Sequence, residues 1–368
     1  MAEKLRIIVN AIPLVNIKTG VGRYIEGLYR ELQKIKGLEI GFFDGQTVSS
    51  SMPSLRSIGS WAKKADLFWR LPTPIALCLR LILHFRRELT FKRLVSEFDL
   101  YHETSFFPFR SPVPVVFTIH DLSLLRFPEW HPRERVIFWR LFFRRRLKQA
   151  KEIICVSEFT RKEVREFLAI PEKRLHTTLL GYDPFLFRPA SSEEKERVRK
   201  KYSLPEVFYL VLGTGDPRKN FRLVDKASPL LPHPVVSAGW SGWSSSPEKR
   251  IHFLGYVPDR DLAGLYSLAR AFIFPSLYEG FGLPVLEAMA CSCPVVISKE
   301  ASLPEIGGDA ALYIKDVNDP FSLVKEIKKL EDPFFRNERK RKVLRQAQRF
   351  SWEDTAQKTH KIFLKALR

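Results

Sequence analysis

One stretch of the chain decides the fold class, and its sequence is AFIFPSLYEGFGLPVLEAMA over residues 271–290. The first four residues are apolar, as in a buried strand, and a loop with two glycines follows. Pro284 suits the first turn of a helix, because the N–H that proline lacks has no partner there. The stretch therefore predicts a strand, a close-approach loop and a helix whose N-terminus faces an anion or sugar hydroxyls.

Two carboxylates bracket this loop, Glu279 on the loop and Glu287 inside the helix. Glu279 is placed to reach the hydroxyls or the reacting carbon of a sugar, and Glu287 to accept two hydrogen bonds from a ribose diol. An ordinary loop acid and a solvated helix position are the alternative interpretation. The coincidence of strand, glycines, proline and paired acids in one window favours a nucleotide-sugar site, with the loop backbone contacting the donor at Gly280, Phe281, Gly282 and Leu283.

Short apolar runs alternate with helical patterns along the whole chain, which is typical of βαβ units around parallel sheets. The length of 368 residues exceeds the roughly 250–300 residues at which one core stops growing, so we expect two domains. The runs predict one doubly wound sheet in each half: residues 5–10, 38–43, 99–102, 114–119 and 153–156, then residues 207–212, 234–238, 251–254, 271–274, 294–298 and 310–314.

Turn residues near position 190 interrupt the pattern and indicate a domain boundary. We expect a first, acceptor-side domain over residues 1–188 and a nucleotide-sugar-binding domain over residues 189–350. A C-terminal helix over residues 351–368 crosses back to the first domain. The predicted fold is α/β, with two Rossmann-like doubly wound domains facing a central cleft and closing over the donor.

The net charge of +20 is concentrated in residues 51–150, which hold 18 basic and 8 acidic residues. Large apolar residues alternate with these bases, as in FWRLFFRRR at residues 138–146. The basic, aromatic stripe of residues 57–146 suits an anionic membrane surface; a solvated basic face, or side-chain stems covering the core, are the alternatives. The charge also suggests a non-enzymatic nucleic-acid binder, but no recognition motif is present, so we expect no nucleic acid partner.

The remaining sequence signals exclude several classes of protein. Four cysteines lack the number and spacing of a disulfide framework or a zinc site, which fits a reducing cytoplasm. The N-terminal and internal apolar runs are too short for a signal peptide or a membrane span. We expect a cytoplasmic protein, at most peripheral at the inner face of the cell membrane, with no metal site and no cofactor.

Residues 279–287 resemble the Glu-x7-Glu motif of retaining glycosyltransferases of family 4, which have the GT-B fold. The likeness extends to residues 253–257, 294–296, 302–305 and 308–310. The resemblance implies that Glu279 contacts the donor sugar and Glu287 the ribose, and that the base is held by backbone near Tyr256 and Val257. Ser292 departs from the family pattern, which usually has glycine in that turn.

Two further loops are similar to phosphate-binding loops of the same family. Gly213 opens the loop of residues 213–220, in which Arg218 and Lys219 are expected to neutralise the leaving diphosphate. Many members have arginine where this chain has Thr214, and a solvated turn pair is the alternative. Gly20, Val21 and Gly22 resemble the family's glycine loop in the first domain, which faces the donor phosphates; a plain turn is the alternative there.

His120 follows the apolar run 114–119, where a histidine can hydrogen-bond a sugar hydroxyl. The corresponding family residue is associated with donor binding and turnover; a structural histidine bonded to Asp121 is the alternative. Residues 120–122, 127–129 and 217–220 resemble bacterial mannosyltransferases of surface-polysaccharide synthesis. The resemblance therefore implies GDP-mannose as donor and a saccharide or lipid-linked saccharide as acceptor, with retention of configuration. UDP-glucose, a UDP-N-acetylhexosamine, or an epimerase or phosphorylase of related fold remain alternatives.

Overall fold

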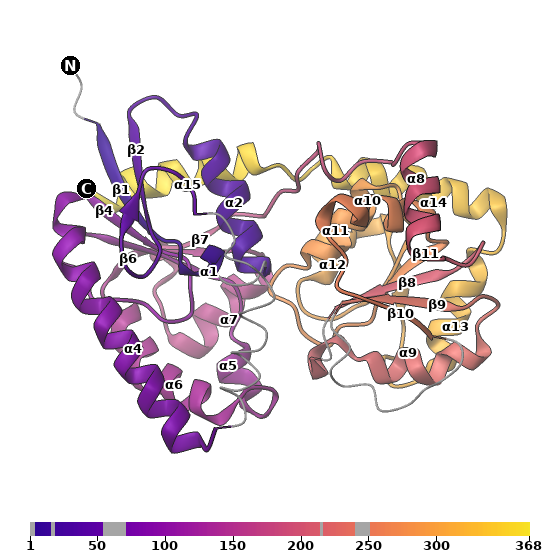
Figure 1. The fold of residues 1–368 in the computed structure, drawn as a ribbon, viewed down its shortest axis with the longest axis horizontal. Coiled ribbons are helices and arrows are strands. Elements are labelled where there is room, and N and C mark those ends of the chain that lie inside the picture. The colour runs from indigo at the N-terminus through magenta and orange to yellow at the C-terminus, as the bar shows by residue number, and fades with distance from the viewer. Residues whose placement is uncertain (1–3, 16–18, 54–70, 214–215, 240–250) are drawn as a thin grey trace. The chain divides into compact units, whose positions relative to one another are not determined.

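The computed structural model describes residues 4–15, 19–53, 71–213, 216–239 and 251–368. The chain divides into two compact units (Figure 1): unit 1 contains Met1–Leu180 and Trp352–Arg368, and unit 2 contains Gly181–Ser351. Residues 181–188, assigned to the first domain from the sequence, therefore group with unit 2. The C-terminal helix α15 (Trp352–Ala366) groups with unit 1.

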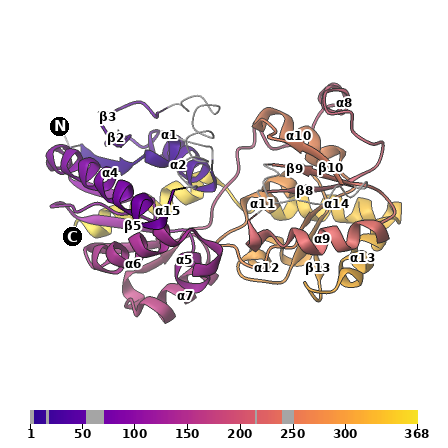
Figure 2. The ribbon, with the colours of Figure 1, turned by 60° about the horizontal axis from the view of Figure 1, so that its bottom comes forward.

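Unit 1 is built on a seven-stranded sheet with the order β3-β2-β1-β4-β5-β6-β7. All neighbouring strands are parallel except β2 and β3, which are antiparallel. The strands are β1 (Leu5–Asn10), β2 (Leu38–Phe43), β3 (Val48–Ser49), β4 (Leu100–Glu103), β5 (Val115–Ile119), β6 (Ala150–Cys155) and β7 (Leu175–Thr177). The helices that flank this sheet (Figure 2) are α1 (Ile12–Val15), α2 (Gly20–Leu32), α4 (Thr73–Leu94), α5 (Ser123–Arg126), α6 (Arg133–Leu147), α7 (Glu158–Leu168) and α15.

Helix α15 packs on α2 within unit 1, and one glycine permits the contact. A Cβ at Gly27 would lie 2.1 Å from Cε2 of Trp352, so only glycine leaves room for the indole. Helices α4 and α6 pack against each other in the same unit. Apolar residues of β1, β4, β5 and β6 form the core beneath these helices.

Unit 2 holds a fully parallel six-stranded sheet with the order β10-β9-β8-β11-β12-β13. The strands are β8 (Tyr209–Leu212), β9 (Val235–Ala238), β10 (Ile251–Gly255), β11 (Ala271–Phe274), β12 (Val295–Ser298) and β13 (Leu312–Ile314). The helices are α8 (Ser192–Lys201), α9 (Phe221–Ala227), α10 (Asp259–Leu268), α11 (Leu283–Ala290), α12 (Leu303–Gly307), α13 (Pro320–Lys329) and α14 (Pro333–Ala347).

The predicted doubly wound sheets are confirmed in both units. Every apolar run named from the sequence overlaps a strand, whereas the short strands β3 and β7 carry too few residues for a pattern. In each sheet the strand order reverses at one point, between β1 and β4 in unit 1 and between β8 and β11 in unit 2. Ligands of open α/β sheets bind at such switch points, beyond the carboxyl ends of the strands.

The turn between α11 and β12 explains why the family favours glycine there. Ser292 has a φ of 59°, in the left-handed region of backbone conformation that residues other than glycine rarely adopt. Its hydroxyl donates a hydrogen bond to the Lys340 carbonyl oxygen at 3.1 Å, which ties the turn to α14. The serine therefore keeps the conformation that glycine would adopt more easily.

Candidate functional site

The switch point of unit 2 brings together two loops that are distant in sequence. The amide of Leu277, after β11, donates to the carbonyl oxygen of Arg218, after β8, at 2.7 Å. Beside this contact the Lys219 ammonium Nζ donates to Glu279 Oε1 at 2.6 Å. The two side chains are 17% and 14% exposed, and Nζ also lies 4.6 Å from the centre of the Phe274 ring. The predicted carboxylate and the predicted base thus form one ion pair at the strand ends.

Arg218 is held differently from its neighbour. Its Nε and Nη2 donate to Asp216 Oδ2 at 2.9 and 2.7 Å. Burial raises the pKa of the Asp216 carboxyl, but the hydrogen bonds and charge of Arg218 outweigh burial, so that the pKa lies below its usual value. Asp216 therefore offsets part of the Arg218 charge, whereas Lys219 is paired with the candidate catalytic acid. Thr214 lies outside the described residues.

The glycine loop after β11 is fixed by its backbone and by a serine. Gly282 has a φ of 107°, and a Cβ there would lie 2.7 Å from Leu303 Cδ2. The Ser302 hydroxyl lies 2.9 Å from the carbonyl oxygen of Glu279 and 2.8 Å from that of Phe281. Ser302 was not among the predicted site residues, and only its position in the family-like stretch indicated it. Gly280, Phe281 and Leu283 are buried in this loop.

Glu287 lies inside α11 and is 3% exposed. A solvated helix position, the alternative interpretation of this residue, is therefore wrong. Burial of a carboxylate is costly unless polar partners compensate. Tyr256 and Val257 follow β10 and are 55% and 6% exposed, so only the tyrosine presents its side chain to solvent.

Three glycines meet at the carboxyl ends of the adjacent strands β8, β9 and β10. A Cβ at Gly239 would lie 2.1 Å from the Gly213 carbonyl oxygen, and the Gly239 amide donates to the Gly255 carbonyl oxygen at 2.8 Å. Gly213, Gly239 and Gly255 all have positive φ. Of the three, only Gly213 was predicted as a site residue; Gly255 lies within the family-like residues 253–257, and Gly239 was indicated only by its position at a strand end. Together they let three loops approach one another closely.

In unit 1, His120 follows β5 as predicted. Its Nε2 donates to the Thr104 carbonyl oxygen at 3.0 Å, and its ring meets the Tyr24 ring edge-on at 4.9 Å between centroids. Burial lowers the His120 pKa to about 4, although Thr104 and the Asp121 charge act in the opposite direction. The imidazole is therefore neutral at pH 7, and the Nε2 contact fixes the tautomer that leaves Nδ1 as an acceptor.

A buried polar network at the switch point of unit 1 was not predicted. Asn10 Nδ2, at the end of β1, donates to Glu103 Oε1, at the end of β4, at 3.0 Å. Tyr101 and the Ser105 amide also donate to this carboxylate. Burial raises the Glu103 pKa, while these hydrogen bonds oppose the shift. The Thr104 hydroxyl donates to the Asn10 carbonyl oxygen at 2.6 Å, so the network holds the segment that binds His120.

The glycine loop of unit 1 begins α2. Thr19 is the N-cap, and its side chain accepts from the Gly22 amide at 3.3 Å. A Cβ at Gly20 would meet no atom within 4 Å, so packing does not require glycine there. Val21 is half-buried and Gly22 buried. The start of α2 is therefore open enough at Gly20 for a ligand to approach the backbone.

The described ranges lack two kinds of feature. They contain no group of three or more His, Cys, Asp or Glu side chains arranged to hold a metal ion. In the same ranges, no helix is both long enough and apolar enough to cross a membrane.

Comparisons with known proteins match both units. The Glycosyltransferase Family 4 model matches residues 18–185, and the Glycosyl transferases group 1 model matches residues 243–349. The O-antigen chain mannosyltransferase B of Escherichia coli is 35% identical, over 96% of this chain and 98% of the relative. The MMP alpha-(1->4)-mannosyltransferase of Mycolicibacterium hassiacum is 26% identical, over 95% of each chain. The structure of sucrose-phosphate synthase from Thermosynechococcus elongatus has the same fold, with a TM-score of 0.73 at 18% identity and 99% coverage of both chains.

Proposed function

This chain belongs to glycosyltransferase family 4, and we propose that it transfers mannose from GDP-mannose to a hydroxyl of a saccharide or lipid-linked saccharide in cell-surface polysaccharide synthesis. The 35% identity to an O-antigen mannosyltransferase over nearly the full length of both chains supports the sugar and the pathway class. The observation that carries the site assignment is the 2.6 Å contact between Lys219 and Glu279. A cation and a carboxylate at one switch point suit a diphosphate bonded to a sugar.

We assign the donor groups as follows. Glu279 accepts hydrogen bonds from the sugar hydroxyls, Lys219 and Arg218 bind the diphosphate, and Glu287 binds the ribose. Lys219 exchanges its carboxylate partner for the phosphate oxygens when the donor enters, and this exchange frees Glu279 for the sugar. Backbone groups of the α11 loop and near the base bind the rest of the nucleotide, at Gly213, Gly280, Phe281, Gly282, Leu283, Tyr256 and Val257.

Unit 1 contributes contacts of two kinds in this proposal. The backbone of Gly20, Val21 and Gly22 contacts the donor phosphates at the start of α2, where the helix dipole favours negative charge. His120 accepts a hydrogen bond from a sugar hydroxyl at Nδ1, because its Nε2 is engaged with Thr104. Burial keeps the imidazole uncharged, so the contact does not add a positive charge beside the reacting carbon.

Transfer proceeds with retention of configuration. The acceptor oxygen attacks the anomeric carbon on the face from which the diphosphate departs, the bond between that carbon and the phosphate oxygen breaks, and the departing phosphate takes the acceptor proton. Lys219 stabilises the charge that develops on the leaving group. NMR of the product distinguishes the stereochemical outcomes, and an inverted anomeric configuration would refute this step.

Basic side chains take the part of a metal ion in stabilising the diphosphate. Lys219 and Arg218 supply two fixed positive charges beside the β11 loop. We therefore expect full transfer activity in EDTA. A strict requirement for a divalent cation, restored by adding that cation, would contradict the assignment.

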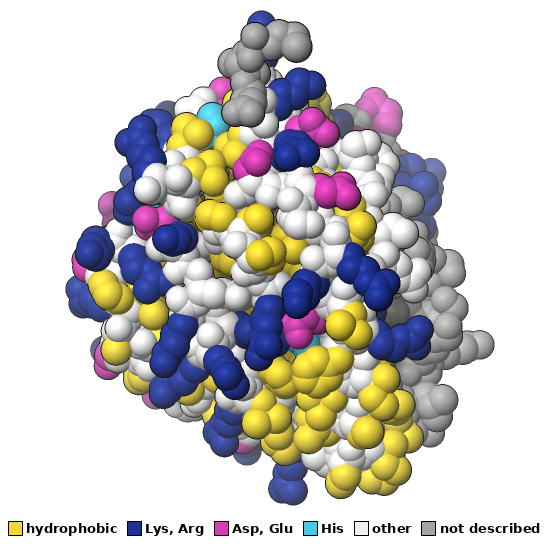
Figure 3. Space-filling view, turned by 90° about the vertical axis from the view of Figure 1, so that its left-hand side faces the viewer, with side chains coloured by type: hydrophobic (Ala, Val, Ile, Leu, Met, Phe, Trp, Pro, Cys, Tyr) yellow, Lys and Arg dark blue, Asp and Glu magenta, His cyan; other side chains and the backbone are white. Residues whose placement is uncertain are grey.

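An exposed apolar surface on α4 and α6, which we call the α4/α6 patch, supports binding to a membrane. The same two helices carry exposed basic side chains, including Arg86, Arg140 and Arg144. On the face drawn in Figure 3, apolar side chains gather in the lower part and Lys and Arg lie around them. Residues 57–70 of the predicted stripe lie outside the described residues. The patch consists of large apolar side chains that are 40–62% exposed: Ile75, Leu79, Ile82, Leu83, Phe85, Leu89, Ile137 and Leu141.

We propose that the α4/α6 patch docks on an anionic lipid surface, since apolar area flanked by bases has both properties that such docking needs. Sedimentation with vesicles containing anionic lipid should show binding that weakens as salt rises. Ile82→Asp should reduce binding, whereas Phe334→Asp, at a residue of unit 2 that is 88% exposed, should leave it unchanged. Equal sedimentation of both variants and the wild type would contradict docking through this patch.

A thermal-shift screen tests the donor. GDP-mannose at a hundredfold excess over its Kd should stabilise the protein by about 2.7 kcal/mol, because the ligand binds only the folded state. UDP-glucose and a UDP-N-acetylhexosamine should give smaller shifts. A larger shift with either UDP-sugar would replace GDP-mannose as the donor while leaving the reaction class unchanged.

A further inference from the structure

A second charged cavity lies at the opposite end of two strands already described. It has a volume of about 180 Å³ and is lined by residues that precede β8 and β11 and by one face of α14. The carboxyl ends of the same two strands carry the loops of Lys219 and Glu279, so this cavity is distinct from the donor site. The lining residues are Glu206, Val207, residues 268–270, Arg336 and Lys340.

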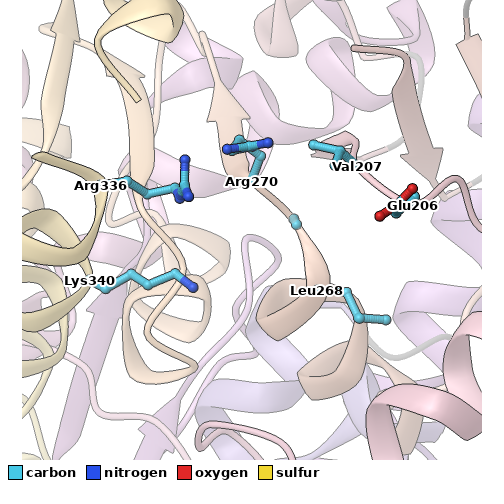
Figure 4. A pocket seen from close by; sticks show the side chains of 7 residues that line it. Glu206, Val207, Leu268, Arg270, Arg336 and Lys340 are labelled. Atoms are coloured by element: carbon cyan, nitrogen blue, oxygen red, sulfur yellow. The ribbon is translucent and has the colours of Figure 1, made fainter. Parts of the chain in front are cut away.

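Three basic side chains converge on this cavity. Arg336 and Lys340 extend from α14 toward Arg270, which stands immediately before β11 (Figure 4). Arg336 Nη1 donates to the Leu330 carbonyl oxygen at 2.8 Å, which holds its guanidinium in place. Arg270 Nη1 lies 3.9 Å from Glu331 Oε2, at the edge of ion-pair distance.

The basic groups outnumber the acidic groups that could neutralise them. Glu331 is shared, because it also accepts from the Tyr209 hydroxyl at 2.7 Å and from His233 Nε2 at 3.1 Å. Glu206 stands exposed at the rim. Within the described ranges, Lys340 has no carboxylate within 4 Å of its ammonium group. The residues that line the cavity, three basic and one acidic, therefore carry a net positive charge.

The positive charges in the cavity repel one another. Burial lowers the Lys340 pKa, Cys293 opposes the shift, and the charges of Arg336, Lys195 and Arg270 lower it further. Burial and the Arg270 charge lower the Arg336 pKa in the same way, while Glu331 and Asp332 act in the opposite direction. A bound anion would relieve both effects. Arginine and lysine together supply planar and point-charge donors, a combination that suits the oxygens of a phosphate group.

We propose that this cavity is an anion site for a small molecule bearing a phosphate group, separate from the donor site. The phosphate contacts Arg270, Arg336 and Lys340, and the apolar side chains of Val207 and Leu268 in the lining contact the carbon skeleton of an ester. The site does not depend on the identity of the nucleotide-sugar donor, so its failure and that of the proposed function are distinguishable.

Calorimetric titration with inorganic phosphate, at constant ionic strength maintained with chloride, tests the site. Lys340→Gln should weaken phosphate binding about tenfold, since it removes a charge-assisted contact. Lys340→Arg should retain binding. Lys342→Gln is the matched control on the same helix, because Lys342 pairs with Glu338 at 2.6 Å and does not line the cavity.

Two further measurements test whether phosphate binds at this cavity and not at the donor loop, and whether Lys340→Gln remains folded. Lys219→Met should retain the phosphate binding that Lys340→Gln loses. In the absence of phosphate, Lys340→Gln should unfold at the wild-type temperature or above it. The substitution removes a positive charge that Arg270 and Arg336 repel. Absence of saturable phosphate binding, equal binding by wild type and Lys340→Gln, or loss of the same binding in Lys219→Met would overturn the proposal.

Discussion

At the switch point of unit 2, Glu279 is 14% exposed and pairs with Lys219, whereas at that of unit 1, Glu103 is fully buried and hydrogen-bonds to Asn10 and Tyr101. Glu103 is the last residue of β4 and Glu279 lies in the loop after β11, and both strands border the point where strand order reverses. Burial raises the pKa of Glu103, and the carboxyl accepts hydrogen bonds from Asn10, Tyr101 and the Ser105 amide. One topology thus places an accessible ion pair in one unit and a structural polar network in the other.

The largest expected effect separates the two switch points by activity. Lys219→Met should lower kcat/KM by about 10²–10³-fold, the typical loss when a fixed group stabilising the developing charge is removed. Lys226→Met, at an exposed position on α9, is the matched control and should transfer at the wild-type rate. Transfer by Lys219→Met within threefold of the control would remove this residue from the reaction.

A substitution in the other switch point should affect stability. Asn10→Leu removes the amide that donates to Glu103 and leaves a buried carboxylate short of a donor, which costs about 1–3 kcal/mol. Chemical denaturation should show the loss, with hydrogen exchange accelerating in the strands of unit 1. Asn318→Leu, at an exposed position of unit 2, should leave unit 1 unchanged. If Asn10→Leu left unfolding unaltered, the network would not support the sheet end.

A substitution at His120 could affect both activity and stability. His120 belongs to the candidate site, and it also hydrogen-bonds to Thr104 beside the buried network. His120→Asn should reduce transfer about tenfold, equivalent to one hydrogen bond of about 1.4 kcal/mol. The reduction should appear mainly in kcat/KM for donor, with the unfolding temperature nearly constant. A large fall in unfolding temperature with normal transfer would make His120 a structural residue.

A further expected effect is the loss of stability of unit 1 in acid. Burial lowers the pKa of His102 to about 3 and that of His84 to about 4. The unfolded chain binds protons at these residues below about pH 6.5 while the folded unit does not. The free energy of unfolding therefore falls as pH drops from about 6.5 toward 4, by up to about 1.4 kcal/mol per pH unit for each histidine.

Unit 2 should respond at lower pH. Burial raises the pKa of Asp261, but hydrogen bonds from Lys201 and Arg197 outweigh burial and bring it to about 2. The stability from this group is present above its unfolded pKa of about 3.9 and is lost only as pH falls toward 2. Hydrogen exchange at pH 7 and pH 5 should therefore show weakening of unit 1 alone, and His84→Phe should reduce it. Equal weakening of both units at pH 5 would contradict this difference.

The sequence predicted the sheets and the β11 loop because both depend on local pattern. Apolar runs mark buried parallel strands, and Gly280, Gly282 and Pro284 mark a strand-to-helix loop within a few residues. Two contacts could not be predicted in this way. Lys219 and Glu279, and likewise Asn10 and Glu103, are brought together by strand order, which no local pattern records.

Burial was the other quantity that the sequence left open. Glu287 has the helical position of a solvated acid but is 3% exposed, because α11 lies among buried elements. The apolar residues of α4, in contrast, were expected either to meet a surface or to cover the core, and the structure exposes many of them. Residue type alone does not decide which face of a helix is covered.

Donor titration by calorimetry is the most direct test that Glu279 binds the sugar at the switch point of unit 2. GDP-mannose and GDP would be titrated into wild type, Glu279→Gln and the control Glu300→Gln, an exposed acid after β12. We predict that Glu279→Gln binds GDP-mannose about tenfold more weakly and GDP as well as wild type or better, since Lys219 is then free for the diphosphate. Unchanged GDP-mannose affinity in Glu279→Gln, or an equal loss for GDP and GDP-mannose, would contradict the assignment.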